Sequence, residues 1–210
     1  MDSYRIPTKS GASEYVDKRS RFLGLVQPAG SEDEARAVIA ACKKQYHDAR
    51  HNCWCYLLRD GTERYSDDGE PQGTAGIPML EVFRRAGVTN AVCVVTRYFG
   101  GVLLGANGLV RAYSHSTALA IENAQVKVML PCYPVSIQTD YALYGKIAYH
   151  LPQEDILQLD TIFEDQVELK LLVRDTLWEP LKKELIELTS GQVEIVSGGL
   201  QYADFSKAKK

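Results

Sequence analysis

The segment from Ala91 to Thr96 constrains the fold of this chain more than any other. Its sequence, Ala-Val-Cys-Val-Val-Thr, is continuously apolar and mostly β-branched. A strand with one face in water alternates apolar and polar residues, whereas an unbroken run of this kind is typical of a strand buried on both faces. We therefore expect residues 91–96 to form a central strand of a sheet.

Further elements are expected on both sides of this strand. Ser31 and Glu34 form a capping-box pair, and apolar residues follow at helical spacing, which predicts a helix over residues 31–46. Pro78 suits the first turn of a second helix, which Gly87 ends. A third helix is expected from about Gly105 or Asn107 to Asn123, and strands are expected at 21–26, 53–58 and 125–130.

Pro131 opens a second unit with its own set of elements. The patterns predict strands over 133–139, 156–163 and 167–173, and a last strand that begins at Val193. They also predict a helix over 143–151 and a second helix that Asp175 can cap and that Gly191 ends. The order βαββαβ is the arrangement of a ferredoxin-like domain. We therefore predict an α+β chain of two domains, residues 1–130 and residues 131–210.

Composition excludes several classes of protein. Apolar residues make up 45% and charged residues 24% of the 210, which is ordinary globular composition. No run approaches the roughly 18 apolar residues that a membrane-spanning helix needs, and no secretory signal is visible at the N-terminus, so the expected location is cytoplasmic. The five cysteines are an odd number and scattered, which favours reduced thiols that act as small hydrophobic residues.

The charge is unevenly divided between the two halves. Residues 1–130 carry 16 Lys and Arg against 14 Asp and Glu, which gives +2, and residues 131–210 carry 8 against 13, which gives −5. An anionic partner should therefore meet the first half. The excess is small, since a strong nonspecific binder of nucleic acid is normally far more basic.

The segment from Thr96 to Tyr113 is the strongest candidate for a binding site. It contains four glycines, Gly100, Gly101, Gly105 and Gly108, directly before and within the start of a helix that carries Arg111. Glycines let backbone amides approach a ligand, a helix N-terminus favours anions, and Arg97 and Arg111 can supply bidentate contacts to phosphate. The alternative interpretation is a tight turn whose glycines only permit close packing.

This segment is not a nucleotide P-loop. Gly100 and Gly105 have the spacing of one, but Ala106 and Asn107 stand where a P-loop needs lysine and then serine or threonine. Without a lysine for the phosphates or a hydroxyl for Mg²⁺, we do not expect hydrolysis of nucleoside triphosphates.

An acidic segment forms a possible second loop site, made of Asp67, Asp68, Glu70 and Thr74. Such a cluster can bind Mg²⁺ through one or two carboxylates. We favour the interpretation in which the acids bond to amides of their own loop or pair with an arginine.

His47, His51, Cys53 and Cys55 resemble zinc ligands at first sight. Cys53 and Cys55 would share one face of a strand while His47 ends a helix, and zinc needs four convergent ligands. Catalysis by Cys53 with His51 is not expected either, because neighbours in sequence seldom converge as a catalytic pair. We therefore assign no metal, no cofactor and no catalytic residue.

Three motifs together resemble the YigZ/IMPACT family. They are Ala49-x-His51-x-Cys53, Asp67-Asp68-Gly69-Glu70-Pro71-x-Gly73-Thr74-Ala75-Gly76, and Val95-Thr96-Arg97-Tyr98-Phe99-Gly100-Gly101-x-x-Leu104-Gly105-x-x-Gly108-Leu109-Val110-Arg111-Ala112-Tyr113. The resemblance to the signature domain covers about the first 130 residues, and the remainder resembles the small C-terminal domain of bacterial members. One departure is Asn107, where many members have another small residue, often glycine.

The resemblance implies a first domain like domain 2 of ribosomal protein S5 and a ferredoxin-like second domain similar to one in translation elongation factors. It also implies that eukaryotic relatives are translation regulators, which bind a large regulatory protein through an additional domain. Small-molecule kinases share the S5-like fold, so the fold alone does not select a function.

We therefore expect a noncatalytic regulator associated with translation, which contacts RNA or a ribosome-associated protein through the surface of Arg97 and Arg111. Tyr98, Phe99 and Tyr113 are either stacking partners for bases or core residues. The alternative is an enzyme that binds a phosphorylated small molecule or a nucleotide in the glycine-rich loop. The segment lacks a loop lysine and a paired general acid and base, which favours the binder.

Overall fold

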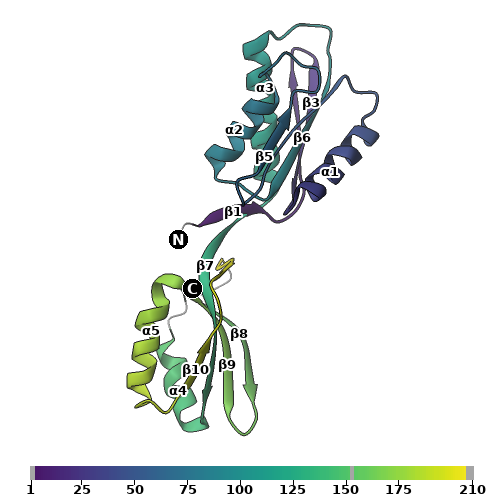
Figure 1. The fold of residues 1–210 in the computed structure, drawn as a ribbon. Coiled ribbons are helices and arrows are strands. Elements are labelled where there is room, and N and C mark those ends of the chain that lie inside the picture. Colours follow the sequence, from purple (N-terminus) through teal and green to yellow (C-terminus); the bar gives the residue numbers. More distant parts are fainter. Residues whose placement is uncertain (1–2, 152–153, 207–210) are drawn as a thin grey trace. The chain divides into compact units, whose positions relative to one another are not determined.

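The computed structural model describes residues 3–151 and 154–206. Its contacts divide the chain into two units, one of Tyr4–Lys127 and the other of the residues from Val128 onward together with Ser3. The ribbon in Figure 1 shows that each unit has a sheet and helices of its own. The α+β class with two domains that the sequence predicts is therefore confirmed.

The first domain is built on a five-stranded antiparallel sheet, in the order β2-β3-β6-β4-β5. Its strands are β2 (Gly11–Asp17), β3 (Ser20–Pro28), β4 (His51–Leu57), β5 (Glu63–Ser66) and β6 (Ala91–Tyr98). β6 lies in the middle and is buried from Ala91 to Arg97, which confirms the expectation of a central strand. A further short strand, β1 (Tyr4–Pro7), pairs at Arg5 with Val88.

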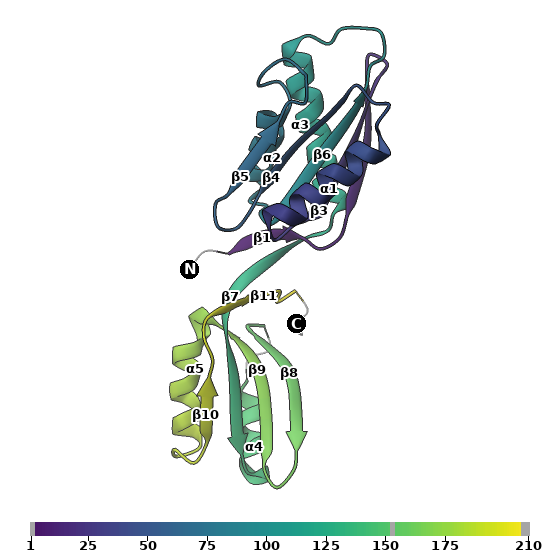
Figure 2. The same cartoon turned by 45° about the vertical axis from the view of Figure 1, so that its right-hand side comes forward.

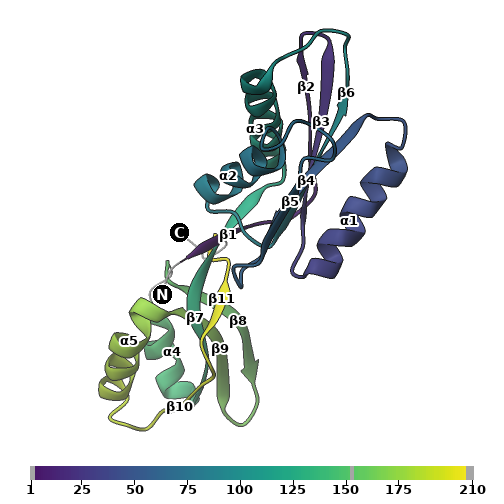
Figure 3. The same ribbon diagram turned by 45° about the horizontal axis from the view of Figure 1, so that its top comes forward.

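Helices cover both faces of this sheet. α1 (Glu32–Gln45) lies on one face, and α2 (Gly76–Ala86) and α3 (Ala106–Asn123) lie on the other, as Figure 3 shows. The alternation along β6 explains how one strand serves two cores. Val92 and Val94 pack with α1, whereas Cys93 and Val95 pack with α2 and α3.

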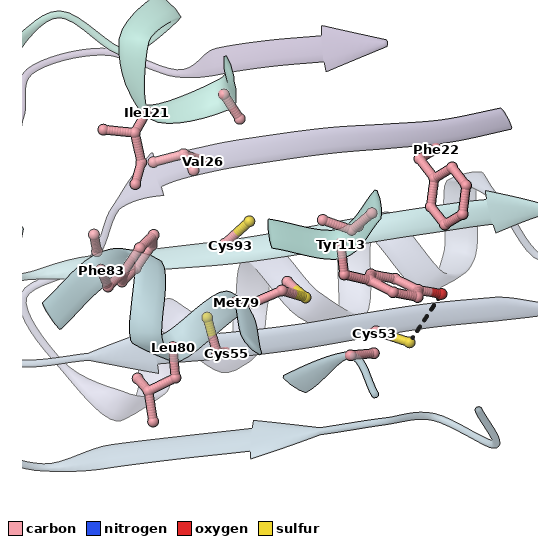
Figure 4. Packing of buried hydrophobic residues seen from close by; sticks show 14 of the residues in the cluster. Phe22, Val26, Cys53, Cys55, Met79, Leu80, Phe83, Cys93, Tyr113 and Ile121 are labelled. Carbon is pink, nitrogen blue, oxygen red and sulfur yellow. Dashed lines mark hydrogen bonds between the residues drawn. The ribbon is translucent and has the colours of Figure 1, made fainter. Parts of the chain in front are cut away.

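The core beneath α2 and α3 is rich in sulfur. Figure 4 shows Cys53, Cys55 and Cys93 among Met79, Phe83 and Tyr113. All five cysteines are free and buried, which confirms that they serve as small hydrophobic residues. Burial raises the pKa of the Cys93 thiol to about 12, so this thiol stays protonated at neutral pH.

The second domain has the ferredoxin-like strand order. Its elements are β7 (Val126–Thr139), α4 (Tyr141–His150), β8 (Ile156–Phe163), β9 (Val167–Arg174), α5 (Asp175–Leu188), β10 (Glu194–Ser197) and β11 (Gln201–Ala203). β8, β9, β7 and β10 pair in this order, and every pair is antiparallel. The apolar core beneath α4 and α5 includes Ile137, Ile147 and Leu185.

Two details differ from the sequence-based expectation. β7 continues through Pro131 as one strand, where we expected two strands with a break. A proline removes only its own N–H, and a strand tolerates this wherever that donor is not needed. The N-cap of α5 is Arg174 rather than Asp175, which is the first helical residue and accepts a hydrogen bond from the next amide.

In the part of the chain that is described, no helix is both long enough and apolar enough to span a membrane.

Candidate functional site

The glycine-rich loop packs tightly against the turn between β2 and β3. A side chain on Gly100 would lie 2.0 Å from the carbonyl carbon of Arg19, so only glycine fits there. The Gly100 amide also donates to Ser20 Oγ at 3.2 Å. Gly101 and Gly105 have φ angles of +86° and +76°, which favour glycine for conformational reasons. Close packing therefore accounts for Gly100 and for Gly108, where a side chain would lie 2.9 Å from Leu104 Cβ, whereas the turn conformation accounts for Gly101 and Gly105.

The turn between β2 and β3 was not predicted, and it brings cations to this loop. Lys18 and Arg19 form a two-residue connection with φ angles of 43° and 68°, the pattern of a type I′ hairpin turn. Both residues are exposed. Just before the turn, Asp17 Oδ2 lies 3.6 Å from Arg111 Nη2, which links the turn to α3.

The first turn of α3 is open to solvent. Gly105 occupies the N-cap position and has no side chain to accept from the first amides. The exposed Ala106 and Asn107 follow, and no acidic residue stands in this turn. An uncapped helix start without nearby acids favours an anion.

Arg97 does not reach this surface. Its Nη1 donates to Glu70 Oε1 at 2.6 Å and its Nη2 to Ser20 Oγ at 3.4 Å. The side chains of Arg97 and Glu70 are only 7% and 3% exposed. The expectation that Arg97 and Arg111 together clamp a phosphate is corrected here, because the Arg97 side chain is buried and its two Nη groups bond to Glu70 and Ser20.

The buried Glu70 carboxylate accepts hydrogen bonds from Tyr113 as well as from Arg97. Tyr113 donates its hydroxyl proton to Glu70 Oε1 at 2.8 Å. The Cys53 thiol donates to the Asp67 carbonyl oxygen at 2.9 Å, and its sulfur lies 3.4 Å from the Tyr113 hydroxyl oxygen, a contact that Figure 4 shows. Desolvation by burial raises the pKa of both Cys53 and Tyr113, so both keep their protons at neutral pH. Neither group is therefore available as an anionic nucleophile.

His51 closes the other side of Glu70. Its Nδ1 lies 2.8 Å from the Asp68 carbonyl oxygen, and because a carbonyl can only accept, Nδ1 carries the proton. The remaining Nε2 lies 4.0 Å from Glu70 Oε2. A second proton on His51 would therefore complete an ion pair with Glu70.

The acidic loop is satisfied within the protein. Asp67 accepts from the amides of Gly73, Ala75 and Gly76 and so stabilises the start of α2. Asp68 pairs with Lys43 at 2.6 Å and accepts from the Asn52 amide, and Thr74 donates to the Pro71 carbonyl. Asp67, which bonds to its own loop, and Glu70, which pairs with Arg97, follow the favoured interpretation, whereas Asp68 pairs with a lysine and with an amide of β4.

Comparisons with known proteins identify both halves of the chain. Residues 18–121 match the family described as "Impact N-terminal domain". Residues 137–192 match the family described as "Domain of unknown function (DUF1949)". "IMPACT family member YvyE" of Bacillus subtilis is 34% identical over 206 residues, which cover 97% of this chain and 95% of that protein. This chain belongs to the IMPACT family.

Two further likenesses extend this assignment. A crystal structure of a hypothetical protein is 28% identical with a TM-score of 0.60, covering 95% of this chain and 98% of the other. It supports a fold of two domains that is shared within the family. "Protein IMPACT" of Rattus norvegicus is 28% identical over 50% of this chain, and the match covers 34% of the rat protein.

The three aromatic residues that could stack on bases, Tyr98, Phe99 and Tyr113, do not lie at one surface of this IMPACT-family chain. Tyr98 follows Arg97 on β6, so it points to the opposite face, where its hydroxyl donates to Asp48 Oδ1 at 2.9 Å. Tyr113 is fully buried, whereas Phe99 on the loop is 41% exposed. The period of two along a strand could have separated Tyr98 from Arg97 at the sequence level.

The structure places a second arginine, Arg85, beside Arg111, which the sequence did not single out. A groove of about 500 Å³ between α2 and α3 is lined by Arg111, Arg85 and His115 over an apolar floor. Helical spacing predicts both helices but not which of their faces meet, so Arg85 was not associated with Arg111.

No three His, Cys, Asp or Glu residues of the described chain lie close enough together to bind a metal ion. Cys53 and Cys55 lie in the same apolar core, whereas the exposed His47 follows the end of α1. As expected, Cys53 and Cys55 share one face of β4 while His47 lies apart from them.

Proposed function

We propose that this chain is a noncatalytic regulator associated with translation, and that it binds RNA phosphates at a glycine-loop surface. This surface consists of the turn residues Lys18 and Arg19, the loop and helix start from Gly100 to Gly108, and Arg111. Membership of the IMPACT family supports the link to translation regulation. Cytoplasmic location is part of the same proposal.

The observation that carries the proposal is the contact of Arg111 with Asp17, just before the turn whose Arg19 backbone packs on Gly100 of the loop. The Arg111 side chain is 71% exposed although it pairs with Asp17, so most of its donors remain available to a phosphate. The uncapped amides of α3 supply further donors. Arg97 has a supporting role, because it holds Glu70 and Ser20 beneath the loop.

The competing hypothesis, an enzyme acting on a phosphorylated small molecule or nucleotide, needs an activated group near the loop. Cys53 and Tyr113 keep their protons, and Glu70 accepts from both Arg97 and Tyr113. These three groups are therefore poor nucleophiles and bases, which favours binding without chemistry.

The test is fluorescence polarisation with a labelled single-stranded RNA, measured over a range of salt concentrations. Arg111→Ala should weaken binding by about 1–3 kcal/mol at low salt, since a charge-assisted contact is lost. The slope of log affinity against log salt should fall by about 0.7, the contribution of one phosphate contact on a single strand. Lys183→Ala, which removes an exposed cation from the second domain, is the matched control.

Equal affinity and an equal salt slope for wild type and Arg111→Ala would contradict the proposed surface. If the wild-type chain binds no RNA at low salt but binds a ribosome-associated protein, the proposal of RNA as the partner is wrong.

A further inference from the structure

A second groove of the first domain lies on the face of the sheet opposite to Arg111. It has a volume of about 420 Å³ and is bordered by α1, β4 and β5, which Figure 2 shows side by side. Aromatic and cationic side chains dominate its lining: Arg36, Lys43, Trp54, Tyr56 and Arg64. None of these residues belongs to the glycine-loop surface.

The floor of this groove is a flat aromatic shelf. Trp54 and Tyr56 are two residues apart on β4, so both point toward α1. Their rings are nearly parallel, with an interplanar angle of 6° and centroids 5.9 Å apart. Tyr56 is 2% exposed and donates its hydroxyl proton to Glu32, whereas Trp54 is half-buried. Tyr56 therefore holds the indole of Trp54 in place, and part of that indole remains open to a ligand.

Cations reach the shelf from two sides. Arg36 and Lys43 are two turns apart on α1, and Arg64 comes from the edge strand β5. Glu32 lies 3.5 Å from Arg36, and Asp68 pairs with Lys43. The Arg64 guanidinium instead donates to the backbone carbonyl of Glu63. The lining of the groove itself holds three cations and no carboxylate, and Glu32 and Asp68 lie at its border.

We propose that this groove binds a nucleotide unit, with its base stacked on Trp54 and its phosphate at Arg36 and Arg64. Stacking on an aromatic ring suits any base, because every base has a π face, and arginine pairs with phosphate in a bidentate manner. The nucleotide unit comes either from a free mononucleotide or from a single-stranded RNA. The inference does not depend on the glycine-loop surface.

The two tryptophans make a direct test possible. Trp178 lies in the second domain and is 5% exposed, so Trp178→Phe leaves Trp54 as the only tryptophan of the full chain. Adenosine 5′-monophosphate and a short oligoadenylate should both quench Trp54 fluorescence. Ribose 5-phosphate, which lacks the base, should not. Arg36→Ala with Arg64→Ala should weaken the affinity for the mononucleotide about tenfold or more, whereas Lys183→Ala should leave it unchanged.

The same titrations distinguish the two sources of the nucleotide unit. An oligonucleotide that binds at least about tenfold tighter than the mononucleotide indicates an RNA strand, and similar affinities indicate a free nucleotide. If the Trp178→Phe variant does not fold, fluorescence polarisation of a labelled oligonucleotide replaces the quenching measurement. Trp54→Ala, made in the otherwise wild-type chain, should then weaken the binding of the oligonucleotide about tenfold. Absence of quenching at millimolar mononucleotide, equal quenching by ribose 5-phosphate, or tighter binding of an acidic peptide than of the mononucleotide would each overturn the proposal.

Discussion

The buried ion pair between Glu70 and Arg97 should be essential for the stability of the first domain. Glu70→Gln removes the negative charge while it preserves the size of the side chain and a carbonyl oxygen for the Tyr113 hydroxyl. Arg97, which is 5% exposed, would then stay buried without its counterion. Arg97 Nε already has no hydrogen-bond partner among the described residues, so the guanidinium has little means of compensation.

The expected cost follows from these contacts. Removal of one partner of a buried ion pair destabilises a protein by about 3–5 kcal/mol, because the remaining charge is left uncompensated. Replacement of both partners by uncharged groups is far less costly. We therefore expect Glu70→Gln to cost about 3–5 kcal/mol and Glu70→Gln with Arg97→Met to cost less than the single change.

Urea unfolding measures this effect in the first domain alone. In a Trp178→Phe background, Trp54 fluorescence reports on the first domain. With a urea m-value of about 2 kcal/mol/M, the midpoint for Glu70→Gln should fall by about 2 M. A fall of less than about 0.5 M, or a double variant that is no more stable than the single one, would refute the reasoning.

Three further predictions test other features of the fold. Gly100→Ala should destabilise the first domain by about 1–3 kcal/mol, because its new methyl group would meet the Arg19 backbone. Gly101→Ala should cost about 1 kcal/mol, because its methyl group meets open space but its φ of +86° is strained for a side chain; urea titrations compare the two. Burial raises the pKa of Cys93 from 9.0 to about 12, so between these pH values only the unfolded chain releases the thiol proton. The contribution of Cys93 to the free energy of unfolding should therefore be fully present below pH 9 and should fall as the pH rises toward 12. Urea midpoints at pH 8 and pH 10.5 check the sign, and equal midpoints would contradict it. A chain cut between Lys127 and Val128 should give two pieces that each melt cooperatively in calorimetry.

The elements that the sequence predicts correctly are those with strong local patterns. β6 is an unbroken apolar run, and α1 begins at a serine that accepts from the Glu34 amide. β2 was not predicted because it ends in a Lys-Arg turn, which lacks the usual glycine or asparagine. β5 was not predicted because it has only four residues, all of which are at least partly exposed. These strands depend on neighbours that lie far away in the sequence.

The candidate site was predicted in part for the same reason. The bonding of the acidic loop to its own amides is local, and turn chemistry anticipates it. The burial of Arg97 is not local, because Glu70 is 27 residues away and Ser20 is 77 residues away. A pattern of residue types places an arginine near a glycine loop but does not tell whether it faces solvent or a carboxylate.

The contacts of residues 67–70 connect the two proposed binding surfaces. Asp68 pairs with Lys43, which lines the groove that contains Trp54, and the Asp68 carbonyl accepts a hydrogen bond from His51. His51 faces Glu70, which holds Arg97 beneath the glycine loop. Changes in this acidic segment should therefore disturb both surfaces, whereas Arg111→Ala and Trp54→Ala should each disturb one. Such a difference would identify the acidic segment as a positioning element that serves two sites, because a ligand contact of its own would affect only one of them.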